Sequence, residues 1–310
     1  MSRRAVITGV GVVAPGGIGR ESFWQMLTEG RTATRTITLF DPSGYRSRIA
    51  AECDFDARAA GLSAQQIRRM DRAAQFATVA AREAVADAGL RLDGVEPQRL
   101  TVSVGSAVGC TMGLEQEYAV LSDDGRRWLV DADYRVPQLY GYMVPSTIAV
   151  EIAREVAAEG PVALISTGCT SGIDAVGHAV QLITEGSADI AVTGASDAPL
   201  SPITSACFDA IKATSPNNND PEHASRPFDA QRDGFVLGEG AVHMAGGRFQ
   251  LWFDGSIAET NATGMFHLSG INRGAHDYYI EWIDNKGKTL ASTEKQTLYL
   301  HQASALINNN

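Results

Sequence analysis

An apolar strand turns sharply into a helix at residues 162–172, which read Val162-Ala163-Leu164-Ile165-Ser166-Thr167-Gly168-Cys169-Thr170-Ser171-Gly172. This pattern predicts an α/β fold and places the thiol of Cys169 at a helix N-terminus, where free N–H groups and the helix dipole favour a thiolate. Gly168 and Gly172 leave room for a substrate to approach the sulfur. We therefore predict that Cys169 is a catalytic nucleophile, because such elbows expose the attacking atom. The alternative is a small buried cysteine that packs as a hydrophobic side chain.

The composition limits the classes of protein to which this thiol could belong. The chain has 310 residues, 44% hydrophobic and 20% charged, which is enough for one large domain or two. Its net charge of −10 and the absence of a Lys/Arg stripe argue against a nucleic-acid partner. Its four cysteines form no C-x-x-C pair, which argues against a zinc site and a disulfide-rich secreted domain. We expect no metal and a reducing, cytoplasmic location.

Two features near the N-terminus invite other interpretations. Arg3 and Arg4 precede the apolar residues 5–14, but no A-x-A cleavage site follows, and no run of 18 apolar residues occurs in the chain. We expect neither a secretory signal nor a membrane partner. Gly9 and Gly11 resemble a dinucleotide-binding turn, yet Pro15 and two glycines follow where that motif would open a helix. Nucleotide binding is therefore disfavoured.

Apolar strands and alanine-rich amphipathic helices alternate up to about residue 245, which is typical of an α/β domain with a largely parallel sheet. The helices that we predict span residues 22–29, 63–88, 147–158 and 171–185. The predicted strands span residues 5–8, 100–105, 162–166 and 190–194.

The composition changes abruptly at residue 246. Residues 1–245 contain one lysine, twenty arginines and all eleven prolines, whereas residues 246–310 contain three lysines, two arginines and six of the nine asparagines. Residues 249–253, 276–283 and 297–300 are predicted short strands, with a hairpin loop at 284–287. We predict a domain boundary here, with an α/β domain at 1–245 and a small all-β, sandwich-like module at 246–310.

Residues 1 to about 242 resemble a β-ketoacyl synthase of the thiolase superfamily. The nucleophile elbow at 167–172 matches that family, as does the glycine-rich stretch Gly234-Phe235-Val236-Leu237-Gly238-Glu239-Gly240-Ala241. Residues 102–113 and 223–229 are similar to ketosynthase-α subunits of type II aromatic polyketide synthases. In that system the paired chain-length factor lacks the cysteine, so Cys169 points to the α type. The resemblance implies the N-terminal half of a thiolase-like fold, layered α/β/α.

The resemblance also implies an activity and partners. Cys169 would accept an acyl group from an acyl carrier protein for decarboxylative condensation with malonyl-carrier protein, in polyketide or fatty acid biosynthesis. The backbone N–H of Cys169 would contribute to an oxyanion hole. The substrates ride on the carrier's phosphopantetheine, so we expect no cofactor in the chain itself. A homodimer, or a heterodimer with a chain-length factor, is implied. Arg68, Arg69 and Arg72 form either a carrier-docking patch or, as we favour, a solvated helix face.

The chain departs from the family after about Val242, where the family pattern places two histidines and a lysine in a second half. We therefore expect a truncated ketosynthase that is impaired in condensation. His267, His276 and His301 lie in β-like segments and are not expected to substitute, and His178 and His223 are not expected to act as bases. Residues 266–276 and the following strand resemble an Ig-like sandwich of bacterial envelope proteins. The alternative function is a non-catalytic, chimeric fragment that acts as a binding module.

Overall fold

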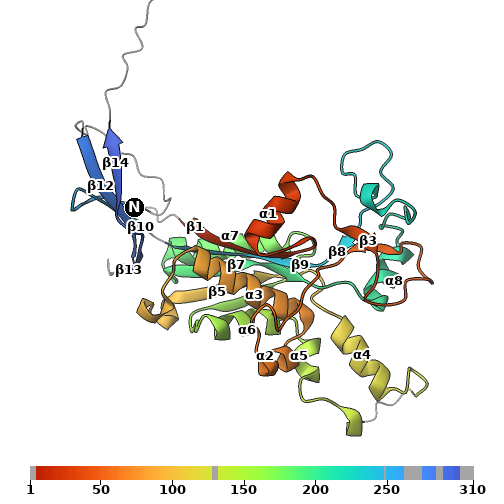
Figure 1. Cartoon of the computed structure of the whole chain (residues 1–310). Coiled ribbons are helices and arrows are strands. Elements are labelled where there is room, and N and C mark those ends of the chain that lie inside the picture. Colours follow the sequence, from red (N-terminus) through yellow and green to blue (C-terminus); the bar gives the residue numbers. More distant parts are fainter. Residues whose placement is uncertain (1–4, 128–131, 248, 262–273, 284–288, 301–310) are drawn as a thin grey trace, which may run out of the picture.

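A computed structural model of the chain describes residues 5–127, 132–247, 249–261, 274–283 and 289–300. A six-stranded sheet with helices on both faces occupies the first part, and a separate antiparallel sheet is formed by the later residues (Figure 1). A small three-stranded sheet consists of β3 (Thr34–Thr36), β4 (Ile49–Ala51) and β8 (Leu237–Gly238). No helix among these described residues is long and apolar enough to span a membrane.

The six-stranded sheet has the order β2-β1-β9-β7-β5-β6. Its strands are β1 (Val6–Ala14), β2 (Gly17–Ile18), β5 (Leu100–Gly105), β6 (Val162–Ile165), β7 (Ile190–Asp197) and β9 (Gly240–Gly247). β5 pairs in parallel with β6 and β7, as the helical crossovers predict. β9 inserts antiparallel between β1 and β7, so the predicted parallel sheet is mixed on this side.

Helices α3, Arg72–Asp87, and α6, Thr147–Glu155, cover one face of this sheet, and α7, Ser171–Glu185, lies on the other (Figure 1). The glycines Gly9 and Gly11 of β1, which resemble a nucleotide-binding turn in the sequence, lie against the backbone of α3. A Cβ atom on Gly11 would lie 1.9 Å from the carbonyl oxygen of Ala80, and one on Gly9 would lie 2.0 Å from that of Ala84. These glycines therefore allow α3 to pack directly on the strand.

The predicted helix at 63–88 is two helices, α2, Ala64–Arg69, and α3. Met70 adopts an extended conformation between them, and the Asp71 side chain accepts a hydrogen bond from the N–H of Ala74 as the N-cap of α3. The prediction of one helix was wrong because the apolar periodicity continues through the break: Met70 is itself buried. The capping aspartate was the sequence signal for the break.

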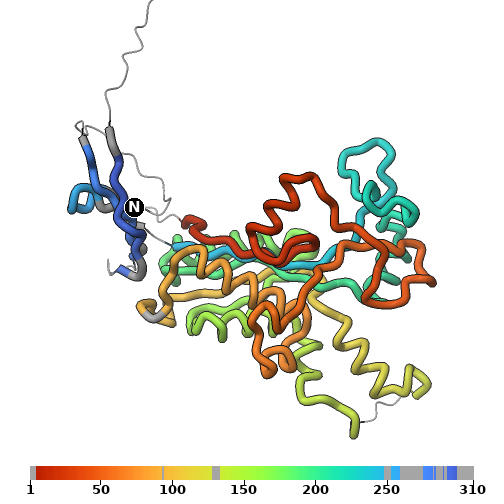
Figure 2. The backbone as a smooth tube through the Cα atoms, in the orientation of Figure 1, coloured from red at the N-terminus to blue at the C-terminus, as the bar shows by residue number. Residues whose placement is uncertain are grey.

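The remaining helical elements connect the layers, and the tube in Figure 2 follows the chain through them. The α-helices are α1, Arg20–Thr28, α4, Met112–Leu121, α5, Leu139–Met143, and α8, Pro202–Ala210. The 3-10 turns are η1, Leu92–Gly94, η2, Pro97–Arg99, η3, Ala132–Tyr134, and η4, Pro221–His223. The α7 helix has the predicted bounds, and Gly186 closes it in a left-handed conformation.

The later strands form one antiparallel sheet around β12, Gly274–Ile283. Its other strands are β10, Phe249–Phe253, β11, Ser256–Asn261, β13, Thr289–Ser292, and β14, Gln296–Leu300. The described elements of this part are all strands, but they form a single sheet, so the sandwich-like module and the domain boundary at 245/246 stay predictions. The predicted hairpin loop at 284–287 and most of the motif at 266–276 lie outside the described residues.

Candidate active site

Cys169 lies in the turn between β6 and α7, with its side chain exposed. Gly168 before it has a φ of 75°, a conformation that suits glycine, and Thr170 after it is the N-cap residue of α7. The Ser171 hydroxyl donates to the Gly168 carbonyl at 2.5 Å and accepts from the Thr167 N–H at 3.0 Å. The structure thus forms the strand-turn-helix that the sequence predicted, with the thiol facing outward.

The elbow lies where the carboxyl ends of three parallel strands meet. β6 leads into Cys169, and the last residue of β5, Gly105, passes beneath the start of α7. A Cβ atom on Gly105 would come within 2.3 Å of the Ser171 carbonyl, so glycine is required for this close approach. In α/β sheets ligands bind at the carboxyl ends of the strands. The position of Cys169 is therefore suited to chemistry.

An open pocket of about 450 Å³ adjoins Cys169. Its walls come from α7, the strands β1, β7 and β9, and the loop after β5. They are mainly apolar or small residues: Ile7, Ala107, Gly168, Ser171, Gly172, Ile173, Val176, Gly194, Ala195, Asp197, Val242 and Met244. The Cys169 thiol therefore faces a surface that suits a hydrocarbon substituent rather than a charged one.

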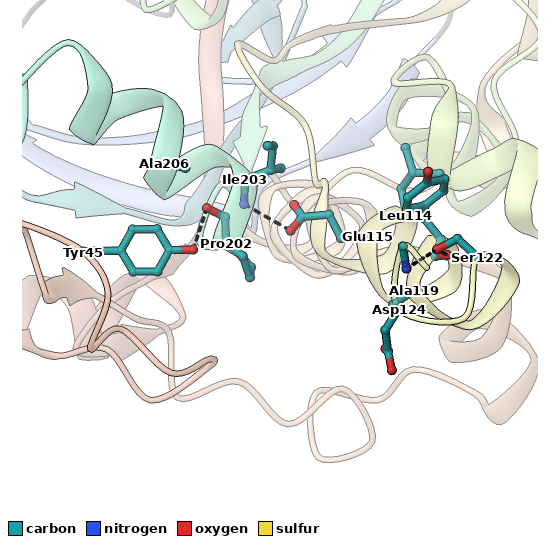
Figure 3. Close-up of a pocket in the computed structure, with 11 residues that line it drawn as sticks. Tyr45, Leu114, Glu115, Ala119, Ser122, Asp124, Pro202, Ile203 and Ala206 are labelled. Atoms are coloured by element: carbon teal, nitrogen blue, oxygen red, sulfur yellow. Dashed lines mark hydrogen bonds between the residues drawn. The ribbon is translucent and has the colours of Figure 1, made fainter. Parts of the chain in front are cut away.

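A larger apolar cavity, of about 750 Å³, lies elsewhere between α4, α8 and Tyr45 (Figure 3). There the Glu115 carboxylate accepts from the Ile203 N–H at 3.1 Å, and the Tyr45 hydroxyl donates to the Pro202 carbonyl at 3.1 Å. No cysteine or histidine is among the described residues that line it. We place the candidate active site at the smaller pocket, because that pocket contains Cys169, the predicted nucleophile.

The described histidines lie away from the Cys169 pocket. The His178 Nδ1 is 3.0 Å from the Ser103 hydroxyl beneath α7, as expected for a ring that points away from the thiol. His223 pairs with Asp220 at 2.8 Å in η4, and the Asp220 carboxylate raises the pKa of that histidine. His276 pairs with an aspartate of the later sheet at 2.7 Å. His267 and His301 lie outside the described residues.

His243 is a residue that the sequence analysis passed over. It lies on β9 between Gly11 of β1 and Gly194 of β7, fully buried, and neither ring nitrogen has a hydrogen-bonding partner among the described residues. Burial lowers its pKa to about 4, against a smaller opposing effect of the Thr193 backbone. The alternation of β9 turns its side chain to the face opposite Val242 and Met244, which line the Cys169 pocket.

The glycine-rich stretch at 234–241 holds a buried carboxylate rather than a catalytic group. The Glu239 side chain is fully buried, and its oxygens lie 2.6 and 2.9 Å from the Arg72 guanidinium. Glu239 also accepts from the Cys53 N–H at 2.9 Å. Burial, with Glu239 nearby, raises the pKa of the Cys53 thiol. This motif therefore ties the start of α3 to β9, and Cys53 is not a reactive thiol.

The arginine cluster on α2 and α3 is not the fully solvated helix face that the sequence analysis favoured, and its role in carrier docking stays a prediction. Arg72 is occupied by Glu239, and Arg69 forms an ion pair at 2.6 Å with Glu151, whose carboxylate is buried. Only Arg68 of the three has an exposed side chain with no ion pair in the described structure. Arg69 thus connects α2 to α6, and Arg72 connects the start of α3 to the residue before β9. Across the described ranges, no group of three or more potential ligands could hold a metal ion.

The chain is similar in sequence to known proteins. The family model "Beta-ketoacyl synthase, N-terminal domain" matches residues 2–244. The chain belongs to the β-ketoacyl synthase family. The tetracenomycin polyketide synthase ketoacyl synthase alpha subunit of Streptomyces glaucescens is 56% identical over 279 residues, covering 87% of this chain and 65% of that protein. The predicted resemblance to ketosynthase-α subunits is confirmed.

Solved ketosynthases share the fold. A type II polyketide synthase ketosynthase bound to the hexaketide, in complex with its acyl-carrier protein, aligns with a TM-score of 0.70 and 29% identity, covering 81% of this chain and 64% of that chain. The ishigamide ketosynthase/chain length factor aligns with a TM-score of 0.68 and 30% identity, covering 80% and 59%. The thiolase-like fold is confirmed. The chain spans less than two thirds of the length of these ketosynthases, and the Ig-like resemblance of its later residues stays a prediction.

Proposed function

We propose that the chain is an acyltransferase of the β-ketoacyl synthase type, in which Cys169 accepts an acyl group from an acyl carrier protein. The observation that carries the proposal is the exposed Cys169 thiol at an apolar pocket beside the carboxyl ends of β5, β6 and β7. A thioester followed by a hydrocarbon chain has the matching chemistry. The polyketide synthase relatives and the ketosynthase solved with its carrier protein support this substrate class.

The proposed step is a transthioesterification. The Cys169 thiolate attacks the thioester carbonyl of the acyl-carrier protein, and a bond forms between the cysteine sulfur and the acyl carbon. The bond from that carbon to the carrier's phosphopantetheine sulfur then breaks, and the released thiolate takes up the proton that Cys169 lost. No oxidant or metal is required. The chain ends the step as an acyl-enzyme.

Condensation with a malonyl group is a second step, for which the pocket offers little support. Decarboxylation and carbon–carbon bond formation need groups that stabilise the developing charge, each worth roughly 10² to 10⁴-fold in rate. No histidine or lysine is among the described residues of the Cys169 pocket. We therefore expect acylation of Cys169 with negligible condensation by this chain alone.

The partners that we propose are an acyl carrier protein and a second ketosynthase-type subunit, either another copy or a chain-length factor. The ishigamide ketosynthase/chain length factor supports the kind of subunit. Of the three arginines considered for carrier docking, only Arg68 is free of an internal ion pair among the described residues, so other surface contributes to any docking site.

Intact-mass spectrometry after incubation with an acyl-carrier thioester tests this function. We expect the chain to gain the mass of the acyl group, and Cys169→Ala to gain none. Cys207 is the second exposed cysteine, so Cys207→Ser serves as the matched control and should retain the adduct. Folded protein without an adduct at Cys169 would overturn the proposal.

A non-catalytic binding module is the second candidate, favoured by exposed apolar side chains around the same pocket. Ile173 is 79% exposed, Ile7 56% and Val242 40%. Exposed apolar patches commonly mark contact surfaces. The same mass measurement separates the two candidates, because a binding module would leave the Cys169 thiol unmodified.

A further inference from the structure

Asp197, the last residue of β7, binds an entire loop through its side chain. The carboxylate accepts hydrogen bonds from the Ser106 hydroxyl at 2.9 Å, from the Val108 and Gly109 N–H groups at 2.8 Å each, and from the Ala107 N–H at 3.1 Å. Three of these donors are consecutive backbone amides. Such a row of N–H groups forms a concave anion site, and here the chain's own carboxylate fills it.

The loop at 106–109 connects this carboxylate to the nucleophile elbow. The Ser106 N–H donates to the Ile165 carbonyl at the end of β6, at 3.0 Å. The Ser171 hydroxyl, on the first residue of α7, lies 3.3 Å from the Ser106 carbonyl. Ala107 and Asp197 both line the pocket beside Cys169. One loop thus joins the ends of β5, β6 and β7 around the thiol.

The charge and the number of donors make this contact strong. Hydrogen bonds to an ionised carboxylate contribute more than neutral ones, and an N–H group left without a partner away from solvent is unfavourable. Without the carboxylate, the three amides would have to turn toward other acceptors, and the pocket wall would move with them. Displacements of about 1 Å near a reacting group can reduce a rate by about 10².

We propose that Asp197 is a positioning residue that holds the loop at 106–109 as one wall of the Cys169 pocket, so that an apolar acyl group is presented to the thiol. It acts through the loop and makes no contact with the sulfur in the mechanism. This inference rests on the proposed function for its biological meaning, but its geometric content can be measured with thiol reagents alone.

The experiment compares two maleimides that differ only in their hydrocarbon chain, N-ethylmaleimide and N-octylmaleimide. Peptide mass mapping of the full chain gives the ratio of octyl to ethyl labelling rates at Cys169, with exposed Cys207 as the internal reference. In the native chain we expect a ratio at Cys169 about tenfold above that at Cys207. Asp197→Ala should lower it to the Cys207 value. Asp197→Asn, which keeps one acceptor oxygen, should lower it about threefold.

Asp189 provides the matched control, because its carboxylate also accepts hydrogen bonds and lies next to β7 in the sequence. It lies before the opposite end of the strand, roughly 25 Å away, and pairs with Arg99 at 2.9 Å. Asp189→Asn should lower the melting temperature and leave the Cys169 ratio unchanged. An equal loss in this control, a native ratio in Asp197→Ala, or no preference for the octyl reagent in the native chain would each overturn the proposal.

A second experiment, with acyl-carrier thioesters, measures whether Asp197 affects the acylation of Cys169. We expect Asp197→Asn to slow acylation of Cys169 about tenfold while N-ethylmaleimide labelling changes less than twofold. If the native chain takes no acyl group but the maleimide ratios follow the expected order, the proposed function fails and the role of Asp197 in the pocket stands. If the native chain and Asp197→Asn are acylated at equal rates, the proposed role of Asp197 is wrong and the proposed function stands.

Discussion

The two faces of the six-stranded sheet are built in opposite ways. Under α3, the helix backbone touches the strand, and Ala73, Ala77 and Ala80 are fully buried. On the face that carries α7, Ile173 and Ile7 remain largely exposed beside the Cys169 thiol. We call the tightly packed face under α3 the closed face, and the face that carries α7 the open face. We expect the side chains with the largest effect on folding to lie on the closed face. The groups that would determine reactivity lie on the open face.

The largest effect that we expect comes from adding one methyl group to the closed face. Gly11→Ala would place a Cβ atom 1.9 Å from the Ala80 carbonyl, against backbone that is locked in α3. We expect a loss of about 4 kcal/mol or more in the free energy of unfolding, or failure to fold. Urea denaturation followed by circular dichroism measures this loss.

The matched substitution on the open face should have the opposite sign. Gly177 lies in the middle of α7, and an added Cβ atom would meet nothing within 4 Å. Gly177→Ala should therefore stabilise the chain by about 0.5 to 1 kcal/mol, because alanine loses less backbone freedom in a helix. Equal losses in the two variants would contradict the contrast between the faces.

The elements that local patterns specify were predictable from sequence. The helix at 171–185 has its predicted bounds, because a glycine elbow precedes it, its own residues form an amphipathic run, and the C-capping Gly186 follows it. The Cys169 elbow was predictable for the same reason. The glycines Gly9 and Gly11 have a packing role that the sequence did not show, because their partner on α3 lies about 70 residues away in the sequence.

The rest depends on pairing between distant residues. Arg69 ends α2 and Arg72 begins α3, and nothing in the neighbouring sequence shows that they form ion pairs with Glu151 and Glu239. The burial of His243 follows from β9 lying between β1 and β7, an order that the chain sequence does not state. Likewise, the role of Asp197 depends on a loop that lies about 90 residues earlier.

The stability of the closed face should also depend on pH, through His243. Burial lowers the pKa of His243 to about 4, so between pH 6.5 and 4 the unfolded chain binds a proton that the folded chain does not. Stability that is present above pH 6.5 is therefore lost as the pH falls, by about 2 kcal/mol at pH 5. Chemical denaturation of the native chain and of His243→Leu at several pH values measures the difference. An equally steep loss in the variant would assign the acid sensitivity to other groups.

Asp71, the N-cap of α3, should act in the opposite direction. Burial raises its pKa to about 6, so between pH 4 and 6 the folded chain binds a proton that the unfolded chain does not. Its contribution is complete below pH 4 and is lost as the pH rises through 6. Asp71→Asn keeps the cap without the charge and should stabilise the chain by about 3 kcal/mol at pH 8, with almost no gain at pH 4. A variant less stable than the native chain at pH 8 would show that the charged cap is favourable.

The smallest effect on folding is expected from the open face itself. Ile173 is 79% exposed on α7, so Ile173→Ser should change the free energy of unfolding by less than about 0.5 kcal/mol. Ile148 on α6 is 1% exposed, and Ile148→Ser there should cost about 3 kcal/mol or more, since it removes buried apolar volume and introduces a hydroxyl. Sedimentation velocity gives the second readout. If the open face makes contacts with other molecules, Ile173→Ser should reduce self-association at unchanged stability. If instead Ile173→Ser costs as much as Ile148→Ser, the α7 face is buried in solution, and the exposed thiol of Cys169 would have to be approached from another side.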